Sequence, residues 1–176
     1  MMKYSKIIFI KFLFIFVFLC NPIFGQHKSK EDLGNALVAS IMNDDINSFK
    51  SLLLPKNVTL EYQDEGNMEA GNGKVRDSLM AQYEVAYDQV VMPGYEQNFL
   101  EMVNLNKTSH IDWTNLNYFI LYKASSKGEE YIPFFIHTKL NNSDYHHFYF
   151  VATRYNGEWY LSGNMELTKE EKYAPK

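Results

Sequence analysis

Two histidines and a glutamate, His137, His147 and Glu166, are the side chains of this sequence whose types and spacing most directly suggest chemistry. The strand pairing described below places them in one row across three neighbouring strands, with Asn117 beside them. Two histidines and one carboxylate are a known ligand set for iron or zinc. However, the row lies on the sheet face opposite the core, and side chains directly across strands run nearly parallel, so they converge poorly on one ion. We therefore predict a solvated, hydrogen-bonded row and no metal site.

Strand-like segments rich in Tyr, Phe, Ile and Val must position these side chains, and they extend from Ile111 to Leu167 with turn sequences between them. Asn156-Gly157 is a strong hairpin signal, because both residues tolerate a positive φ. Further turns are expected over Asn141 to Ser143 and over Ser126 to Gly128. The predicted pairs are Phe150 with Gly163, Phe148 with Met165, His147 with Glu166, Phe134 with Phe150, His137 with His147, Tyr118 with Ile136, and Phe119 with Phe135.

One face of this sheet is apolar and is expected to be the core face, since a slip by one residue would move its side chains into water. Its members are Tyr118, Ile120, Tyr122, Ile132, Phe134, Ile136, Phe148, Phe150, Ala152, Trp159, Leu161 and Met165. Helical patterns come before the sheet. This order predicts an α+β fold, in which N-terminal helices pack on a curved antiparallel sheet.

The first helices are marked by their caps. Ser29 and Asp32 resemble a capping box at the start of one helix. Asp44 or Asp45 can cap a second, short helix that stops at Pro55.

The segment after Pro55 is expected to change from strand to loop to helix. Val58, Leu60 and Tyr62 alternate as in a strand. Gln63 to Gly73 reads as a glycine-rich surface loop, whose acidic residues lack the ordered oxygen ligands of a calcium loop. A long amphipathic helix follows from Lys74, and Pro93 and Gly94 are expected to kink or end it.

Residues 1–25 resemble a secretory signal, because Lys3 and Lys6 precede an apolar run from Ile7 to Leu19 and a small residue, Gly25, offers a cleavage site. An uncleaved membrane anchor is the alternative, although the run is shorter than the roughly 20 residues that span a bilayer. The bulky Leu19 disfavours lipidation of Cys20. We expect an exported protein, periplasmic or secreted, with one domain over 26–168, a solvated tail over 169–176 and no membrane span after signal removal.

Composition restricts the function of the mature chain. Cys20 is the only cysteine, so no disulfide or thiol nucleophile remains after the signal. Three of the 17 basic residues leave with the signal, and the remaining 14 face 21 acidic ones. This balance disfavours nucleic acid as a partner and adhesion to anionic lipid. Phosphate-binding glycine loops and hydrolase or zinc-protease motifs are missing from the sequence, and no cofactor is expected.

The outer sheet face is predicted to carry an aromatic patch of Phe119, Phe135 and Tyr149. A patch of this size is seldom left in water, which indicates a protein partner or a homodimer interface. The alternative is that a terminal segment or the kinked helix covers it.

The order of elements, ending in the Asn-Gly-Glu-Trp-Tyr turn at Asn156 to Tyr160, resembles the nuclear-transport-factor-two-like α+β cone. The segment from Ala36 to Val58, with its helix, Asn-Asp-Asp turn and Phe-x-x-Leu-Leu run, is similar to the opening of such domains. The resemblance implies a curved sheet around the long helix and a pocket at the open end of the cone. Members of this family include isomerases, dehydratases and many noncatalytic binding domains, so the fold does not settle function.

Enzymes of this family place carboxylates, His and Tyr inside the cone. The equivalents that the resemblance implies here are Asp112, Thr138 and His146, with phenols from Tyr83, Tyr118 and Tyr122. Because no motif links these residues, we predict an exported noncatalytic binding or accessory domain, with a small apolar ligand in the cone or a protein partner on the sheet. The alternatives are a small isomerase or dehydratase using Asp112 and His146, and a structural homodimer of the cell envelope.

Overall fold

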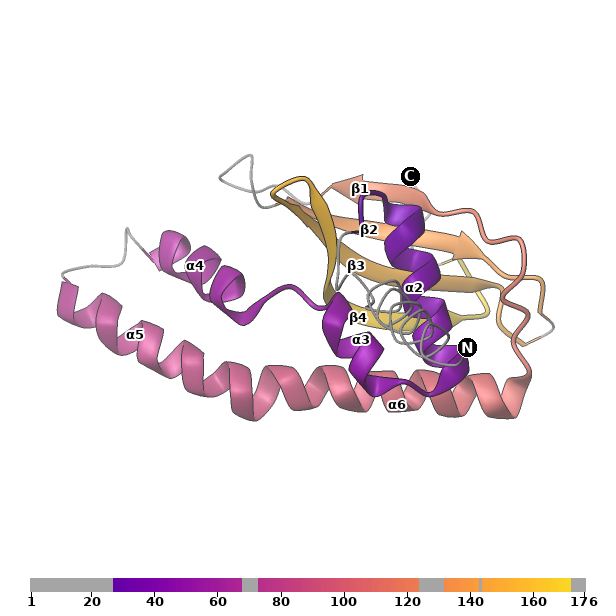
Figure 1. Ribbon diagram of the computed structural model, residues 1–176, viewed down its shortest axis with the longest axis horizontal. Helices are drawn as coiled ribbons and strands as arrows, with labels where there is room; N and C mark the ends of the chain where they lie inside the picture. The colour runs from indigo at the N-terminus through magenta and orange to yellow at the C-terminus, as the bar shows by residue number, and fades with distance from the viewer. Residues whose placement is uncertain (1–26, 68–72, 124–131, 143, 172–176) are drawn as a thin grey trace, which may run out of the picture.

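The computed structural model describes residues 27–67, 73–123, 132–142 and 144–171. Helices come first and strands follow, which confirms the predicted α+β fold (Figure 1). The elements are α2 (Lys30–Asn43), α3 (Ile46–Leu52), α4 (Lys56–Asn67), α5 (Gly73–Ala86), the π-helical segment η1 (Tyr87–Val91), α6 (Met92–Ser109), β1 (Phe119–Lys123), β2 (Ile132–Lys139), β3 (His147–Tyr155) and β4 (Glu158–Thr168).

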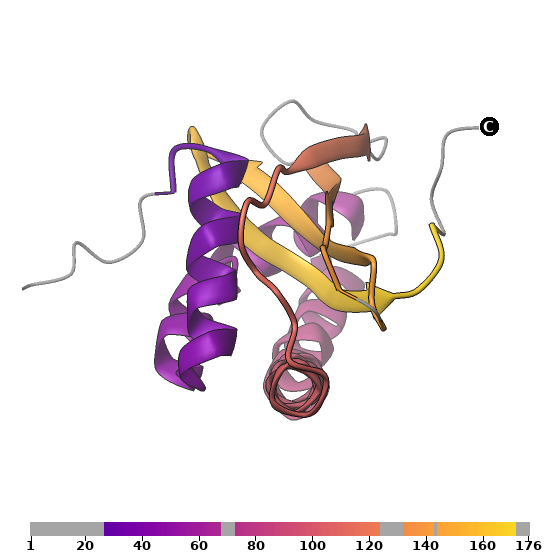
Figure 2. The same ribbon diagram turned by 90° about the vertical axis from the view of Figure 1, so that its right-hand side faces the viewer.

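The strands form an antiparallel meander in the order β1-β2-β3-β4. Helices α2 and α6 pack on one face of this sheet, mainly over β4, as Figure 2 shows with α6 seen end-on. The core lies between these two layers. Its largest fully buried side chains include Phe49, Phe99, Phe148 and Phe150, and Phe49 stacks on Phe99 with ring centroids 4.6 Å apart.

Local capping signals are confirmed at the first two helices. The Ser29 hydroxyl accepts a hydrogen bond from the Asp32 backbone N–H, and the Asp32 carboxylate accepts one from Ser29 N–H. Asp45 caps α3 through bonds from the N–H groups of Asn47 and Ser48. These reciprocal bonds satisfy donors that a helix start otherwise leaves open.

The predicted strand at Val58, Leu60 and Tyr62 is wrong, because this segment is helical and belongs to α4. The Pro55 carbonyl accepts from the N–H groups of Val58 and Thr59 and so starts the helix. The predicted loop from Gln63 to Gly73 is also too long, since α4 continues to Asn67 and α5 begins at Gly73; residues 68–72 lie outside the described part of the chain. Three alternating residues are too few to separate a strand from a helix.

The long helix continues past Pro93 and Gly94, where a kink or an end was predicted. Helices α4 and α5 form a hairpin that projects from the body of the protein, called the arm below, and α5 continues through η1 into α6 (Figure 1). The disturbance lies just before Pro93, at η1. Pro93 has no N–H for the carbonyl of Gln89, and the Met92 N–H instead bonds to the Tyr87 carbonyl five residues back. A wider turn thus absorbs the proline.

The predicted strand pairs are shifted in the structure. The Asn156-Gly157 turn is confirmed, with φ of 50° and 82°, and it pairs Tyr155 with Glu158. Beyond it a bulge between Phe150 and Ala152 moves the pairing by two residues. The other two strand pairs are displaced as well, and the observed partners include Phe150 with Met165, Phe148 with Leu167, Tyr149 with Glu166, Ile136 with Phe150, His137 with Tyr149, and Phe119 with His137.

The predicted core face survives this error, because a slip of two residues keeps each side chain on its own face. Buried as expected are Tyr118, Ile136, Phe148, Phe150, Ala152, Trp159, Leu161 and Met165, and Phe134 packs against them. Ile120 was wrongly assigned to the core face, since it is 43% exposed. The pairing of β1 with β2 becomes irregular between Ile120 and Tyr122. The side chains of Tyr122 and Ile132 lie outside the described residues.

Among the described helices, none combines the length and the apolar character needed to cross a membrane. Residues 1–26, which hold the predicted signal, are outside the described part of the chain.

Candidate binding site

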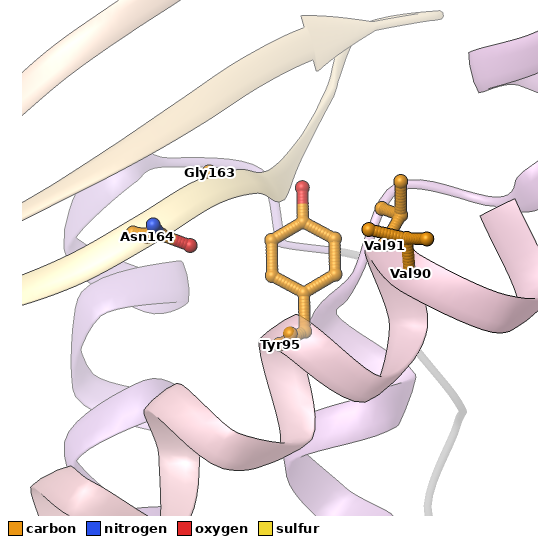
Figure 3. Close-up of a pocket in the computed structure, with 6 residues that line it drawn as sticks. Val90, Val91, Tyr95, Gly163 and Asn164 are labelled. Atoms are coloured by element: carbon orange, nitrogen blue, oxygen red, sulfur yellow. The ribbon is translucent and has the colours of Figure 1, made fainter. Parts of the chain in front are cut away.

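An open groove of about 330 Å³ lies where the long helix bends past β4, and we call it the elbow groove. Its lining residues are Val90, Val91, Gly94, Tyr95, Gly163 and Asn164. Figure 3 shows the Tyr95 ring standing between the two valines on one side and the strand residues on the other. The groove therefore has a helical wall from η1 and α6 and a strand wall from β4.

The helical wall owes its shape to η1 and the residues after it. Val90 and Val91 are neighbours in the wide π-helical turn, and both side chains reach solvent, Val90 with 67% of its surface exposed. Gly94 follows Pro93 in the first turn of α6, and a Cβ there would meet no atom within 4 Å. A π-helical turn inside a long helix frequently marks a functional site.

The strand wall depends on Gly163. A Cβ at this position would lie 2.7 Å from the Cβ of Val151 on β3, a distance that side chains do not tolerate. Glycine therefore allows the bulged part of β3 to approach β4 closely. The adjoining Asn164 is exposed and presents an amide to the groove.

The two walls are held together by Asn98. Its side-chain N–H donates to the Met165 carbonyl at 3.1 Å, and its side-chain oxygen accepts from the Met165 N–H at 2.8 Å. Because β4 is an edge strand, this amide takes the place of a neighbouring strand and pins α6 onto the sheet. On the other side of the groove the Leu54 N–H donates to the Leu161 carbonyl at 2.9 Å. Gly163 and Asn164 lie between these two fixed points.

A smaller hollow of about 30 Å³ is lined in part by Tyr95, which the elbow groove also uses. Its other lining residues are Leu54, Thr59, Tyr87, Leu161 and Ser162. Tyr87 is buried, and burial raises the pKa of its phenol, so the ring stays neutral. The Lys56 ammonium lies 5.8 Å from the centroid of this ring and 2.8 Å from the Asp88 carboxylate, which ties α4 to η1.

The elbow groove offers contacts for binding and no acid–base pair. Its lining includes two valines, two glycines, one phenol and one amide. None of these groups carries a charge near neutral pH. The groove therefore suits an uncharged, mostly apolar molecule with one or two hydrogen-bonding atoms.

The residues that the cone resemblance implied for a pocket are spread over the molecule. Tyr83 is exposed on the arm, and His146 is exposed just before β3. Tyr118 is buried against Gly34, with its hydroxyl 3.4 Å from the Asn35 side-chain oxygen. Burial raises the pKa of the Tyr118 phenol. Thr138 is fully buried in β2, opposite Phe148.

Asp112, the predicted base, is held by Thr114. Its carboxylate accepts bonds from the Thr114 N–H at 3.0 Å and from the Thr114 hydroxyl at 2.7 Å. These hydrogen bonds lower the pKa of Asp112, which makes it a weaker base. The structure brings Asp112 to Thr114 and does not show it in contact with His146.

The predicted histidine row is partly assembled, and it is buried instead of solvated. His137 is 3% exposed and His147 is 9% exposed, and the pair is joined directly by a hydrogen bond. Glu166 lies opposite Tyr149, and Asn117 is exposed and bonds to the Asn115 carbonyl. No group of three or more metal-binding side chains occurs among the described residues.

The predicted aromatic patch is uneven. Phe119 is exposed, Phe135 is half-buried and Tyr149 is buried, with its ring stacked on that of His137 at 4.7 Å. Phe119 pairs with His137 and not with Phe135. An interface role for this patch stays a prediction that falls mainly on Phe119.

Sequence reasoning did not single out the elbow groove, although it placed Gly94 in the long helix and Gly163 in a strand. Two signals could have pointed there. Pro93-Gly94 interrupts a helical pattern, and Gly163 interrupts a strand pattern, and both interruptions mark places where the backbone is locally irregular.

Comparisons of the chain with protein-family models, with curated proteins and with solved structures gave no match. The resemblance to the nuclear-transport-factor-two-like cone stays a prediction.

Proposed function

We propose that this chain is an exported, noncatalytic binding domain whose ligand site is the elbow groove. The observation that carries this proposal is the lining of the groove, which is uncharged and combines two valine side chains with one phenol, Tyr95, and one amide, Asn164. Its volume of about 330 Å³ falls at the lower end of the range for small-molecule sites. The ligand is a small, largely apolar molecule with one or two hydrogen-bonding atoms.

The proposal includes the relation to the cone family, with one change. The order of helices followed by a meander supports this relation, and noncatalytic binding domains are common in the family. The ligand, however, is placed between η1 and β4 instead of at the Asp112, Thr138 and His146 positions. The fixed position of β4 supports this placement, because Asn98 and Leu54 bond to this strand on either side of the groove residues Gly163 and Asn164.

The test uses N-phenyl-1-naphthylamine, an uncharged apolar fluorophore with one N–H group, titrated against the folded protein. Binding in the groove raises its fluorescence. The variant Gly94→Leu places a side chain in the groove from a helical position with open space, and it is expected to weaken binding tenfold or more, which corresponds to about 1.4 kcal/mol.

Gly73→Leu is the matched control, because Gly73 is also helical and open but lies at the far end of the arm. It is expected to bind the fluorophore like the wild type. Equal binding by the wild type and Gly94→Leu, or no binding by the wild type, would overturn the proposal.

A further inference from the structure

The bulge between β3 and β4 leaves β4 with more backbone groups than its neighbour can bind. The regular pairs on either side of the bulge are Phe150 with Met165 and Ala152 with Leu161. Between these pairs β3 supplies one residue, Val151, whereas β4 supplies three, residues 162–164. A single residue has one N–H and one carbonyl, so it cannot pair with three residues. Backbone donors and acceptors of β4 are therefore left over at the bulge.

These spare groups belong to the strand wall of the elbow groove. Gly163 and Asn164 both line the groove, and Figure 3 shows them on β4 beside the Tyr95 ring. β4 is an edge strand of the described sheet, so its outer side faces the helices instead of a further strand. Gly163 has no side chain that would keep a ligand away from the backbone. The groove thus offers backbone N–H and carbonyl groups in addition to its side chains.

The protein itself binds the edge of β4 with an amide, one position further along the strand. The Asn98 side chain donates to the Met165 carbonyl at 3.1 Å and accepts from the Met165 N–H at 2.8 Å. Both bonds reach the same residue because the oxygen and one N–H of a primary amide lie on the same side of the C–N bond. This edge is therefore suited to a flat group that presents a donor and an acceptor side by side.

The charges around the groove favour an uncharged ligand. The acidic residues nearest in sequence to the helical wall are Asp88 and Glu96. Asp88 is paired with Lys56 at 2.8 Å, and Glu96 is paired with Lys50 at 2.7 Å. An ionised ligand would give up hydration in the groove without meeting an opposite charge in its lining.

We propose that the ligand of the elbow groove is a small, uncharged primary or cyclic amide that pairs with the spare backbone groups of residues 162–164. Its apolar part contacts Val90 and Val91 on the helical wall. This inference rests on the proposed function and specifies the ligand class. An ordinary peptide bond does not fit, because it is trans and its N–H and carbonyl point in opposite directions.

The length of the open edge also favours a small molecule over an extended peptide. The Leu54 N–H occupies the Leu161 carbonyl at one end, and Asn98 occupies Met165 at the other. Four residues of strand span roughly 13 Å. A peptide strand of several residues would meet the Leu54 segment or the Asn98 side chain, whereas a single amide group fits between them.

Three compounds of closely similar size test the amide class. Quinolin-2-one is a cyclic amide with its N–H and carbonyl side by side. Quinolin-4-one carries the same two groups on opposite sides of the ring, and 1-methylquinolin-2-one keeps the carbonyl but has no N–H. Each is titrated into nitrogen-15-labelled folded protein and followed by NMR. Quinolin-2-one is expected to have a dissociation constant about tenfold lower than the other two. It should also cause the largest shifts at the backbone N–H signals of Gly163 and Asn164.

Two variants separate the strand edge from the side chains. Gly94→Leu fills the groove and should weaken the binding of all three compounds. Asn164→Ala removes the same side-chain contacts from all three compounds and keeps the backbone, so the preference for quinolin-2-one should remain. Loss of this preference in Asn164→Ala would assign amide recognition to the side chain and overturn the pairing with the strand edge.

The fluorophore distinguishes a failure of the amide class from a failure of the proposed function. Equal dissociation constants for the three compounds would overturn the amide class. If N-phenyl-1-naphthylamine then still binds to the wild type and Gly94→Leu still weakens it, the elbow groove remains the site of an apolar ligand. If neither the fluorophore nor any of the three compounds binds, both the amide class and the proposed function are wrong.

Discussion

The Nε2 atom of His137 lies 2.9 Å from the Nδ1 atom of His147, and both rings are buried on the sheet face opposite the core cluster. One nitrogen must donate and the other must accept, so the bond requires at least one neutral ring. Protonation of either buried imidazole beyond this state would place a positive charge where water can hydrate it poorly.

Protonation of this pair should lower the stability of the fold at mildly acidic pH. Burial lowers the pKa of both His137 and His147. The positive charge of nearby groups lowers each pKa further, from His147 and Lys139 for His137 and from Lys139 and His146 for His147, while Glu171 acts in the opposite direction on both. The unfolded chain takes up protons near pH 6.5. The neutral histidine pair should therefore make its whole contribution to the free energy of unfolding above about pH 6.5. This contribution should decrease as the pH falls from there through the lower pKa values of the folded state.

Thermal unfolding between about pH 8 and pH 5 measures this effect, in a range above the titration of most carboxyl groups. The groups that face the pair are Lys139, His146, Tyr149 and Glu171. His147→Gln should flatten the pH dependence, whereas His146→Gln, at an exposed position, should preserve it. A wild-type midpoint that is constant from pH 7 to pH 5 would contradict the prediction.

Trp159→Ala should lower the free energy of unfolding by about 3 to 5 kcal/mol. Trp159 is buried next to Phe134, with ring centroids 4.9 Å apart, and truncation leaves a cavity in the core. Urea unfolding monitored by circular dichroism measures the loss. Phe119→Ala, at an exposed position, is the control and should change stability by no more than about 0.5 kcal/mol. Similar midpoints for the two variants would show that Trp159 contributes little to the core.

Gly163→Ala should destabilise the protein by about 1 to 3 kcal/mol, because the new methyl group would overlap the Val151 side chain. Val151→Ala in the same chain should recover part of this loss by opening space. A double-mutant cycle from urea unfolding gives the coupling free energy, which should be favourable for the double variant. Additive effects would mean that β3 and β4 do not approach at this point.

Local signals in the sequence predicted the fold better than they predicted the pairing. Ser29 with Asp32 and Asn156 with Gly157 act over a few residues, so their geometry follows from residue type. The turn between β2 and β3 has no such residue pair, and the Leu140 N–H bonds to the His146 carbonyl across a wider loop than expected. This wider loop moved His137 opposite Tyr149, and the histidine pair became diagonal instead of direct.

The candidate site was harder to predict, because its parts are distant in the sequence. Tyr95 and Gly163 form one groove only after α6 docks on β4, and no periodic pattern encodes that contact. The expected order of elements included a strand from Val58 to Tyr62. Since this segment is helix α4, it forms part of the arm instead.

Asn98→Ala should lower the free energy of unfolding by about 1 to 3 kcal/mol, because the N–H and carbonyl of Met165 lose the partners that Asn98 supplies at the edge of β4. Gln97→Ala is the matched control, since Gln97 is the exposed neighbour on the same helix and its side-chain amide bonds to Glu101 on the same helix. Urea unfolding of both variants measures the difference. Asn98→Ala should also weaken N-phenyl-1-naphthylamine binding, because Asn98 fixes the helical wall of the elbow groove to its strand wall. If Asn98→Ala unfolds at the same urea concentration as Gln97→Ala, the amide does not hold α6 on the sheet.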